Sequence, residues 1–252
     1  MKKKILALIP ARLNSKRLPK KVILPIGGIP MVIHVYKRAL CSKIIDDVII
    51  CCDDKKINNI AKSYGAKSII TSKKHVNGTE RICEVFKKIK KKYDLIVDVQ
   101  GDEPLIDPTH IDKLVSYHLR NFNTDIVVPS LLINNKKNKH LVKVVANLQN
   151  DILYLSRQQV PFSFNASNQK LLKHLSIVSF KPASLLKFVK LKKSYLEKLE
   201  NIELLRALDN GMKLKTFIIK GNSFSVDVRK DYIEANKFIK RDKVFKLYKN
   251  DI

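Results

Sequence analysis

The sequence predicts an α/β fold in one domain over residues 1–252, built on a mostly parallel central sheet. Short apolar runs alternate with longer amphipathic stretches through the first half of the chain, which is the pattern of repeated strand–helix units. A hydrophobic content of 45% is enough to bury one full core. Seven glycines and nine prolines are too few for a collagen-like or low-complexity chain.

Short apolar runs bounded by charged or turn-forming residues predict the strands of the first half. They cover residues 4–9, 47–52, 67–71, 94–99 and 125–129. Helical periodicity predicts connecting helices at 30–42, 55–64, 79–92 and 108–120. Pro30 and Pro108 open two of these helices, at a position where the missing N–H costs little.

After about residue 130 the alternation changes, which predicts a second, inserted lobe. Strands are expected at 142–148, 152–155, 173–180 and 213–219, with an irregular loop at 156–170 and another at 221–223. Helices are expected at 196–210 and from about 229.

The N-terminus and the cysteines favour a soluble, cytoplasmic protein. The apolar run after Lys4 is only five residues long before Pro10, so a buried first strand explains it better than a signal peptide. No stretch approaches the roughly 18 apolar residues of a membrane span. The cysteines show no CxxC spacing, which favours packed, reduced thiols over disulfides or zinc. They are Cys41, Cys51, Cys52 and Cys83.

The formal charge of +27 raises the possibility of nucleic-acid binding. The charge is mostly lysine and is scattered, and the run at 87–92 falls where an amphipathic helix presents its solvent face. Neither aromatic stacking platforms nor a known binding module accompanies it. We therefore expect a lysine-enriched surface, with no nucleic-acid partner and no membrane insertion.

A basic loop follows the first predicted strand. Ligands of open α/β sheets bind at the carboxyl ends of strands, so this loop is placed to hold a triphosphate. Its cations would neutralise non-bridging oxygens and the charge that develops on departing pyrophosphate. A solvated basic loop is the alternative. The cations are Arg12, Lys16, Arg17 and Lys21.

A carboxylate motif follows the strand at 94–99. Gly101 would allow close approach of the backbone to a ligand, and Asp102 is placed to hold a hard divalent cation. Mg²⁺ commonly uses one or two carboxylates together with substrate phosphates, so a second carboxylate is expected from elsewhere. Asp227 is the candidate, although either aspartate alone is also typical of turns and helix caps.

These stretches resemble the motifs of the 3-deoxy-D-manno-octulosonate (KDO) cytidylyltransferases. Residues 9–21 resemble the family's nucleotide-binding signature, and the sequence Val-Gln-Gly-Asp-Glu-Pro at 99–104 is a specific match. Further matches follow in the family's order over about residues 5–240. They are Asn77–Arg81, Val142–Val145, Ser156-Arg157 with Val160-Pro161, His174-Leu175, Leu196–Glu200 and Glu203–Arg206.

The resemblance implies a Rossmann-like nucleotidyltransferase that transfers CMP from CTP to the anomeric hydroxyl of KDO and releases pyrophosphate, for lipopolysaccharide biosynthesis. It implies a homodimer whose small β-rich lobe, inserted at about 131–195, serves sugar binding and dimerisation. The implied catalytic residues are Arg12, Lys21, Asp102 and Asp227, the two aspartates holding Mg²⁺. The implied nucleotide-binding residues are Pro10, Ala11, Arg12, Ser15, Arg17, Lys21 and Gln100. Those implied near the sugar acid are Arg81, Arg157, His174 and Glu203.

The chemistry of such a reaction needs no protein nucleophile, because the anomeric hydroxyl attacks the α-phosphorus of CTP directly. The sequence accordingly contains no G-x-S-x-G elbow, no HExxH and no P-loop, which counts against hydrolases, zinc proteases and kinase-like enzymes. Glycosyltransferases of related architecture typically carry Asp-x-Asp, which Gly101-Asp102-Glu103 does not fit.

The sequence departs from the family mainly on the sugar side. A second arginine usual after the Ile-Pro-Trp stretch is absent around Phe164, and Val178 and Leu204 replace a tyrosine and a glutamine. Lys20 replaces the usual glycine before Lys21, and 222–225 is less glycine-rich. A more apolar pocket is expected. KDO is the preferred substrate; an amino-KDO or nonulosonate is the alternative, and a non-catalytic basic nucleotide-binding module is the alternative of a different class.

Overall fold

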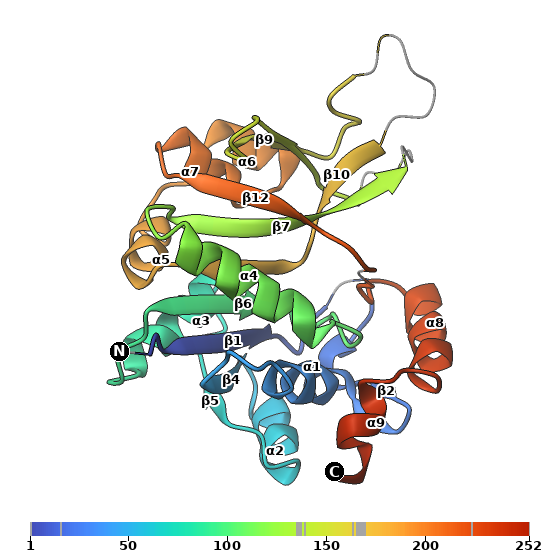
Figure 1. Ribbon diagram of the computed structural model, residues 1–252. Coiled ribbons are helices and arrows are strands. Elements are labelled where there is room, and N and C mark those ends of the chain that lie inside the picture. Colours follow the sequence, from blue (N-terminus) through green and yellow to red (C-terminus); the bar gives the residue numbers. More distant parts are fainter. Residues whose placement is uncertain are drawn as a thin grey trace. The chain divides into compact units, whose positions relative to one another are not determined.

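The computed structural model describes residues 2–15, 17–134, 138, 140–162, 164, 170–222 and 224–251. The chain forms two compact units, unit 1 comprising residues 1–112 with 223–252 and unit 2 comprising residues 113–222 (Figure 1). In the described part of the chain, no helix is both long enough and apolar enough to cross a membrane.

Unit 1 is built on parallel strands in the order β5-β4-β1-β6. These are β1 (Ile5–Ala11), β4 (Asp47–Cys52), β5 (Ser68–Ile70) and β6 (Leu95–Val99). The strands β1, β4 and β6 are almost entirely buried, as expected for parallel strands covered on both faces. The helices packed on them are α1 (Met31–Leu40), α2 (Lys55–Ser63) and α3 (Gly78–Lys88). The predicted α/β class with a mostly parallel central sheet is confirmed.

A β-hairpin between the first strand and the first helix escaped the sequence prediction. The short 3-10 helix η1 (Lys21–Ile23) leads into β2 (Pro25–Ile26), which pairs antiparallel with β3 (Ile29–Pro30). Gly27 and Gly28 form the two-residue turn with φ of 55° and 89°, values that favour glycine. The Gly-Gly pair between Pro25-Ile26 and Ile29-Pro30 was the sequence signal for this hairpin.

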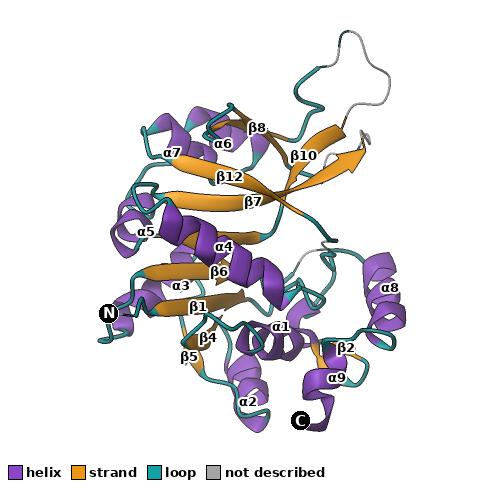
Figure 2. Cartoon of the chain, in the orientation of Figure 1, coloured by secondary structure: helices purple, strands orange, loops and turns teal. Residues whose placement is uncertain are grey.

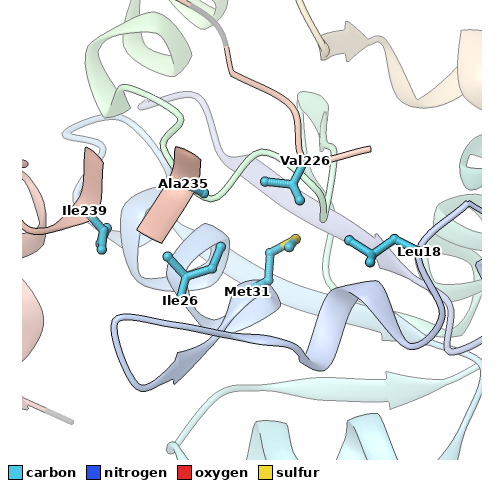
Figure 3. Close-up of a cluster of buried hydrophobic side chains, with 6 residues drawn as sticks. All are labelled: Leu18, Ile26, Met31, Val226, Ala235 and Ile239. Carbon is cyan, nitrogen blue, oxygen red and sulfur yellow. The ribbon is translucent and has the colours of Figure 1, made fainter. Parts of the chain in front are cut away.

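A buried apolar cluster joins the two ends of the chain inside unit 1 (Figure 3). Helices α8 (Arg229–Ile239) and α9 (Phe245–Tyr248) form the C-terminal part of the unit, and α8 contributes Ala235 and Ile239 to the cluster. Leu18 comes from the basic loop and Val226 from the approach to α8. Apolar burial therefore anchors both segments that carry candidate site residues. The remaining members are Ile26 and Met31.

Unit 2 contains a β-rich sheet in the order β11-β7-β10-β8-β9, with β12 paired to β7 (Figure 2). Its strands are β7 (Ile126–Asn134), β8 (Lys143–Ala146), β9 (Ile152–Ser156), β10 (Lys170–His174), β11 (Ile177–Phe180) and β12 (Leu214–Ile219). All of these pairings are antiparallel except the parallel pair β7–β12. The helices of this half are α4 (Pro108–Arg120), which spans the unit boundary, α5 (Pro182–Phe188), α6 (Tyr195–Glu200) and α7 (Leu205–Asp209).

Two elements predicted as continuous are broken in the structure. The strand expected at 173–180 is two strands, because β10 pairs with residues 130–134 of β7 and β11 pairs with residues 126–127. The helix expected at 196–210 is also two elements, since Asn201 adopts φ 52° and ends α6. Helix α5 was missed, although Pro182 at its first position was a signal.

Two fully buried histidines are held neutral by their surroundings. His34 contacts the Tyr248 hydroxyl at 2.8 Å and the Ile26 carbonyl at 2.7 Å. His118 contacts the Ser179 hydroxyl at 2.8 Å. Burial lowers the pKa of each histidine from 6.5 to about 4.

We expect these histidines to destabilise the protein in mild acid. As pH falls below 6.5, the unfolded chain takes up protons that the folded chain does not, so the free energy of unfolding falls until about pH 4. Each histidine should cost about 2 kcal/mol by pH 5. Urea unfolding at pH 7 and pH 5 measures the loss. Equal stability at both pH values would contradict the account.

Candidate active site

Two carboxylates and two cations converge at one end of unit 1. The Nζ atom of Lys21 lies 2.7 Å from Oδ2 of Asp102 and 3.1 Å from Oδ1 of Asp227. Nη2 of Arg17 lies 2.8 Å from the same Asp227 oxygen. These residues come from the basic loop after β1, the turn after β6 and the approach to α8. The structure therefore brings together four side chains that the sequence analysis selected separately.

The charges in this group differ in their access to solvent. The Lys21 side chain is 9% exposed, whereas Asp102 and Asp227 are each 30% exposed. The buried ammonium offsets the repulsion between the two carboxylates and holds them toward one point. The carboxylates remain accessible to a ligand from solvent.

Hydrogen bonds fix the segment that carries Asp227 against the segment that carries Asp102. The Val226 amide donates to the Asp102 carbonyl at 2.9 Å, and the Ser225 hydroxyl donates to Oε1 of Glu103 at 2.6 Å. The Val226 side chain is fully buried, which anchors the residue immediately before Asp227. The separation of the two carboxylates is thus set by backbone and core contacts.

Helix α8 begins directly after Asp227. The Asp231 carboxylate accepts hydrogen bonds from the amides of Asp227 at 2.9 Å and Val228 at 3.0 Å. This is the carboxylate half of a capping arrangement, in which a side chain in the first turn satisfies N–H groups before the helix. Asp231 therefore fixes the backbone of the site, while Asp227 keeps its own carboxylate for Lys21 and Arg17.

The backbone before Lys21 has an unusual conformation. Lys20 adopts φ 56° and ψ 24°, in the left-handed region that favours glycine. This conformation accounts for the glycine that the resemblance leads us to expect at this position. Lys20 lies inside a turn that runs from Leu18 to Lys21. The Lys21 amide closes this turn by donating to the Leu18 carbonyl at 3.2 Å, and Leu18 belongs to the buried cluster.

Gly101 is required by the protein's own backbone. A Cβ atom added there would lie 2.6 Å from the Pro10 carbonyl oxygen, and one added at Gly78 would lie 3.1 Å from Cγ of Pro10. The sequence predicts that Gly101 allows the backbone to approach a ligand; the structure adds that the backbone of strand β1 is already close to Gly101. Gln100 directly precedes Gly101, and its side-chain Nε2 atom donates a hydrogen bond to Oδ2 of Asp98 at 2.8 Å.

Replacing Gly101 with alanine should damage both stability and activity. The methyl group meets a fixed backbone oxygen, so β1 and the β6 turn must separate, at a cost of roughly 1–3 kcal/mol. The shift moves Asp102, and we expect kcat/KM to fall at least about tenfold. Unfolding and steady-state kinetics measure both effects. Gly65→Ala is the control for activity: an added methyl there meets nothing within 4 Å, but φ of 66° strains alanine, so this variant should lose stability and keep its kcat/KM. An equal fall in kcat/KM in the two variants would contradict the explanation.

The other residues expected at the nucleotide lie along the same strand and loop. Pro10 and Ala11 end β1, Arg12 is exposed and Ser15 is partly buried. Lys16 lies outside the described residues.

Arg81 is placed differently from the exposed cations of the loop. It lies on α3 in unit 1, is only 3% exposed, and donates to the Thr71 hydroxyl at 2.6 Å and the Ser72 carbonyl at 3.2 Å. The guanidinium is therefore held by hydrogen bonds within the protein.

Three residues expected near the sugar acid lie in unit 2. Arg157 donates through Nε to the Glu200 carbonyl at 2.7 Å and through Nη2 to the Asn201 carbonyl at 3.0 Å. His174 is partly buried, and burial lowers its pKa to about 4, so the ring is neutral at pH 7. Glu203 lies between α6 and α7.

Lys143 supports this part of unit 2 in a way that sequence reasoning missed. Its ammonium is buried and donates to the carbonyls of Asn138, Leu141 and Arg157 at 2.9, 2.9 and 2.7 Å. Burial lowers its pKa, and three carbonyl acceptors satisfy its three N–H groups. The apolar residues on both sides of Lys143, within residues 142–145, were the sequence signal for the burial of its side chain.

The carboxylate pair suits a hard divalent cation. The described residues contain no group of three or more His, Cys, Asp or Glu side chains arranged to hold a metal. Two aspartates directed at one cation match Mg²⁺, which fills its remaining positions with water and substrate oxygens. Asp102 and Asp227 therefore fit the metal expected from the sequence.

Comparisons with known proteins agree over nearly the entire chain. A model of the cytidylyltransferase family matches residues 6–214. A 3-deoxy-manno-octulosonate cytidylyltransferase from Thermodesulfovibrio yellowstonii is 37% identical over 92% of this chain and 96% of its own. An 8-amino-3,8-dideoxy-manno-octulosonate cytidylyltransferase from a Shewanella species is 37% identical over 90% and 95%. A solved CMP:2-keto-3-deoxy-manno-octonic acid synthetase complexed with CTP is 31% identical with a TM-score of 0.89, covering 94% and 99%.

Proposed function

The chain belongs to the 3-deoxy-manno-octulosonate cytidylyltransferase family, and from this membership we propose that it transfers CMP from CTP to the anomeric hydroxyl of KDO. It is a nucleotidyltransferase with the Rossmann-like fold of that family. The observation that carries the proposal is the convergence of Arg17, Lys21, Asp102 and Asp227 on one point of unit 1.

The reaction forms a bond between the anomeric oxygen and the α-phosphorus of CTP and breaks the bond to the β-phosphate. Pyrophosphate leaves, and the hydroxyl proton passes to solvent. We propose that Arg12, Arg17 and Lys21 hold the triphosphate and offset the charge that grows on the leaving group. Ser15 is proposed to contact a phosphate, and Pro10, Ala11 and Gln100 the nucleoside.

Asp102 and Asp227 are the proposed holders of Mg²⁺. When bound there, the ion would supply positive charge that offsets the negative charge of the transition state. The ammonium of Lys21 already occupies the position that both carboxylates face, so it is proposed to move toward the phosphates as they bind.

The sugar acid is proposed to bind in unit 2 through Arg157, His174 and Glu203. Arginine suits a carboxylate because its planar fork donates two parallel hydrogen bonds. Arg157 is partly buried, and it is proposed to exchange its bonds to the Glu200 and Asn201 carbonyls for bonds to the acid. The relatives include enzymes named for KDO and enzymes named for its 8-amino analogue at similar identity. KDO is the proposed substrate, and the 8-amino acid or a nonulosonate is the alternative.

A panel of acids tests the substrate. The enzyme, CTP and Mg²⁺ are combined with KDO, its 8-amino analogue or a nonulosonate, and pyrophosphate release gives kcat/KM for each. The proposal expects KDO to give the highest value. A higher kcat/KM with either other acid would identify that acid as the substrate and leave the proposed reaction unchanged.

We propose that the enzyme acts as a cytoplasmic homodimer that supplies activated sugar for lipopolysaccharide synthesis. Support for the dimer comes from large apolar side chains left exposed on strands of unit 2, where Leu132, Leu153 and Ile218 are 50%, 59% and 53% exposed. Light scattering should give twice the chain mass of 29.0 kDa. A monomer at micromolar concentration would contradict the dimer and leave the reaction untouched.

A further inference from the structure

Asp53 clamps the start of the basic loop. It follows β4, which pairs in parallel with β1 so that Cys52 lies opposite Ala11. Its Oδ1 atom accepts a hydrogen bond of 2.9 Å from the Leu13 amide, the residue after Arg12. The Asp53 side chain is only 12% exposed, so the bond is largely shielded from water.

Arg81 holds the other oxygen of the same carboxylate. Its Nη2 lies 3.5 Å from Oδ2 of Asp53, and its Nη1 donates to the Thr71 hydroxyl at 2.6 Å. Thr71 in turn donates through its amide and its hydroxyl to the Cys52 carbonyl, at 2.7 and 3.0 Å. The guanidinium therefore joins α3, the segment after β5 and the end of β4.

We propose that Asp53 and Arg81 are positioning residues for CTP, acting together through the Leu13 amide to direct Arg12 and the rest of the basic loop. This replaces the sugar-acid role that the family resemblance implied for Arg81, and it rests on the proposed function of the loop. The guanidinium is 3% exposed and bound to three protein oxygens, so contact with a substrate would require it to leave them. Loss of such bonds in a buried site is costly.

Kinetics separate the two roles of Arg81. Asp53→Ala and Arg81→Gln should each raise KM for CTP at least about tenfold and change KM for the sugar acid less than about twofold. The double variant should be no worse than the poorer single variant, because both act through one network. A selective rise in KM for the sugar acid in Arg81→Gln, with Asp53→Ala unaffected, would overturn the proposal.

A second measurement needs no turnover. In the substrate-free protein, hydrogen exchange of the Leu13 amide should be at least about tenfold faster in Asp53→Ala than in wild type. Unchanged exchange would overturn the clamp even if the enzyme is active, and faster exchange would support the clamp even if the proposed reaction fails. Circular dichroism confirms folding, and Asp53→Asn provides a milder variant that keeps an acceptor oxygen.

The neighbouring aspartate provides a matched control. Asp54 accepts a hydrogen bond from the Lys56 amide at 2.8 Å and caps α2, away from the Leu13 amide. Asp54→Ala should lower stability as the loss of a helix cap does, and leave KM for CTP unchanged. A rise in KM for CTP equal to that of Asp53→Ala would show a general effect of instability and overturn the specific role of Asp53.

Discussion

Asp102→Asn and Asp227→Asn are each expected to lower kcat/KM for pyrophosphate release by about 10³-fold or more. Each variant keeps the shape of the side chain and removes one negative charge from the pair that faces Lys21. A bound metal contributes several kcal/mol to charge stabilisation in such a transfer, and each 1.36 kcal/mol is tenfold in rate. Steady-state assays at saturating and limiting Mg²⁺ measure the loss.

The backbone of the site should survive these replacements. The hydrogen bond between Val226 and Asp102 uses main-chain atoms, and the cap of α8 is provided by Asp231. Asp209→Asn, at an exposed carboxylate on α7, is the matched control and should retain full activity. An active Asp227→Asn enzyme at normal Mg²⁺ would contradict the assigned carboxylate pair.

Lys21→Met should produce the second largest loss, a fall in kcat of about 10²–10³-fold. The replacement removes the cation that contacts both carboxylates and the charge proposed to stabilise departing pyrophosphate. It also leaves two carboxylates facing each other, so the substrate-free protein should lose roughly 1–3 kcal/mol of stability. Steady-state kinetics and urea unfolding measure the two effects.

Adjacent residues provide the controls for Lys21. Lys21→Arg retains the charge and should recover part of kcat, although the planar group cannot reproduce the geometry of the ammonium. Lys20→Met removes an exposed positive charge next to the site and should change neither kcat nor stability. If Lys20→Met and Lys21→Met lose activity equally, the loss of activity is due to the general positive charge of the loop. A specific contact of Lys21 would then be ruled out as its cause.

Local sequence patterns predicted the elements of unit 1 well because each is a strong, short-range signal. The run at 47–52 is apolar and β-branched, and the structure places β4 at the same residues. Pro108 opens α4 as expected. The elements missed or misjudged depend on single residues in special conformations, such as the left-handed Asn201 between α6 and α7.

Local sequence patterns could not predict the geometry of the site, because it depends on contacts between segments that are distant in sequence. Arg17 and Asp227 are 210 residues apart in sequence, and no spacing rule relates them. The sequence offered Asp227 only as a candidate for the second carboxylate, and nothing in it indicated that Lys21 would lie between both carboxylates. Burial is equally nonlocal: nothing in the local sequence distinguishes Arg81 from a surface cation, and it is 3% exposed in the structure.

The identity of the products tests the account most directly. Enzyme, CTP, KDO and Mg²⁺ are incubated, and ³¹P NMR with mass spectrometry follows the phosphorus species. The account predicts pyrophosphate and a CMP–sugar phosphodiester in equal amounts, both dependent on KDO. Saturable CTP binding without any product would indicate a nucleotide-binding module and would contradict nucleotidyl transfer.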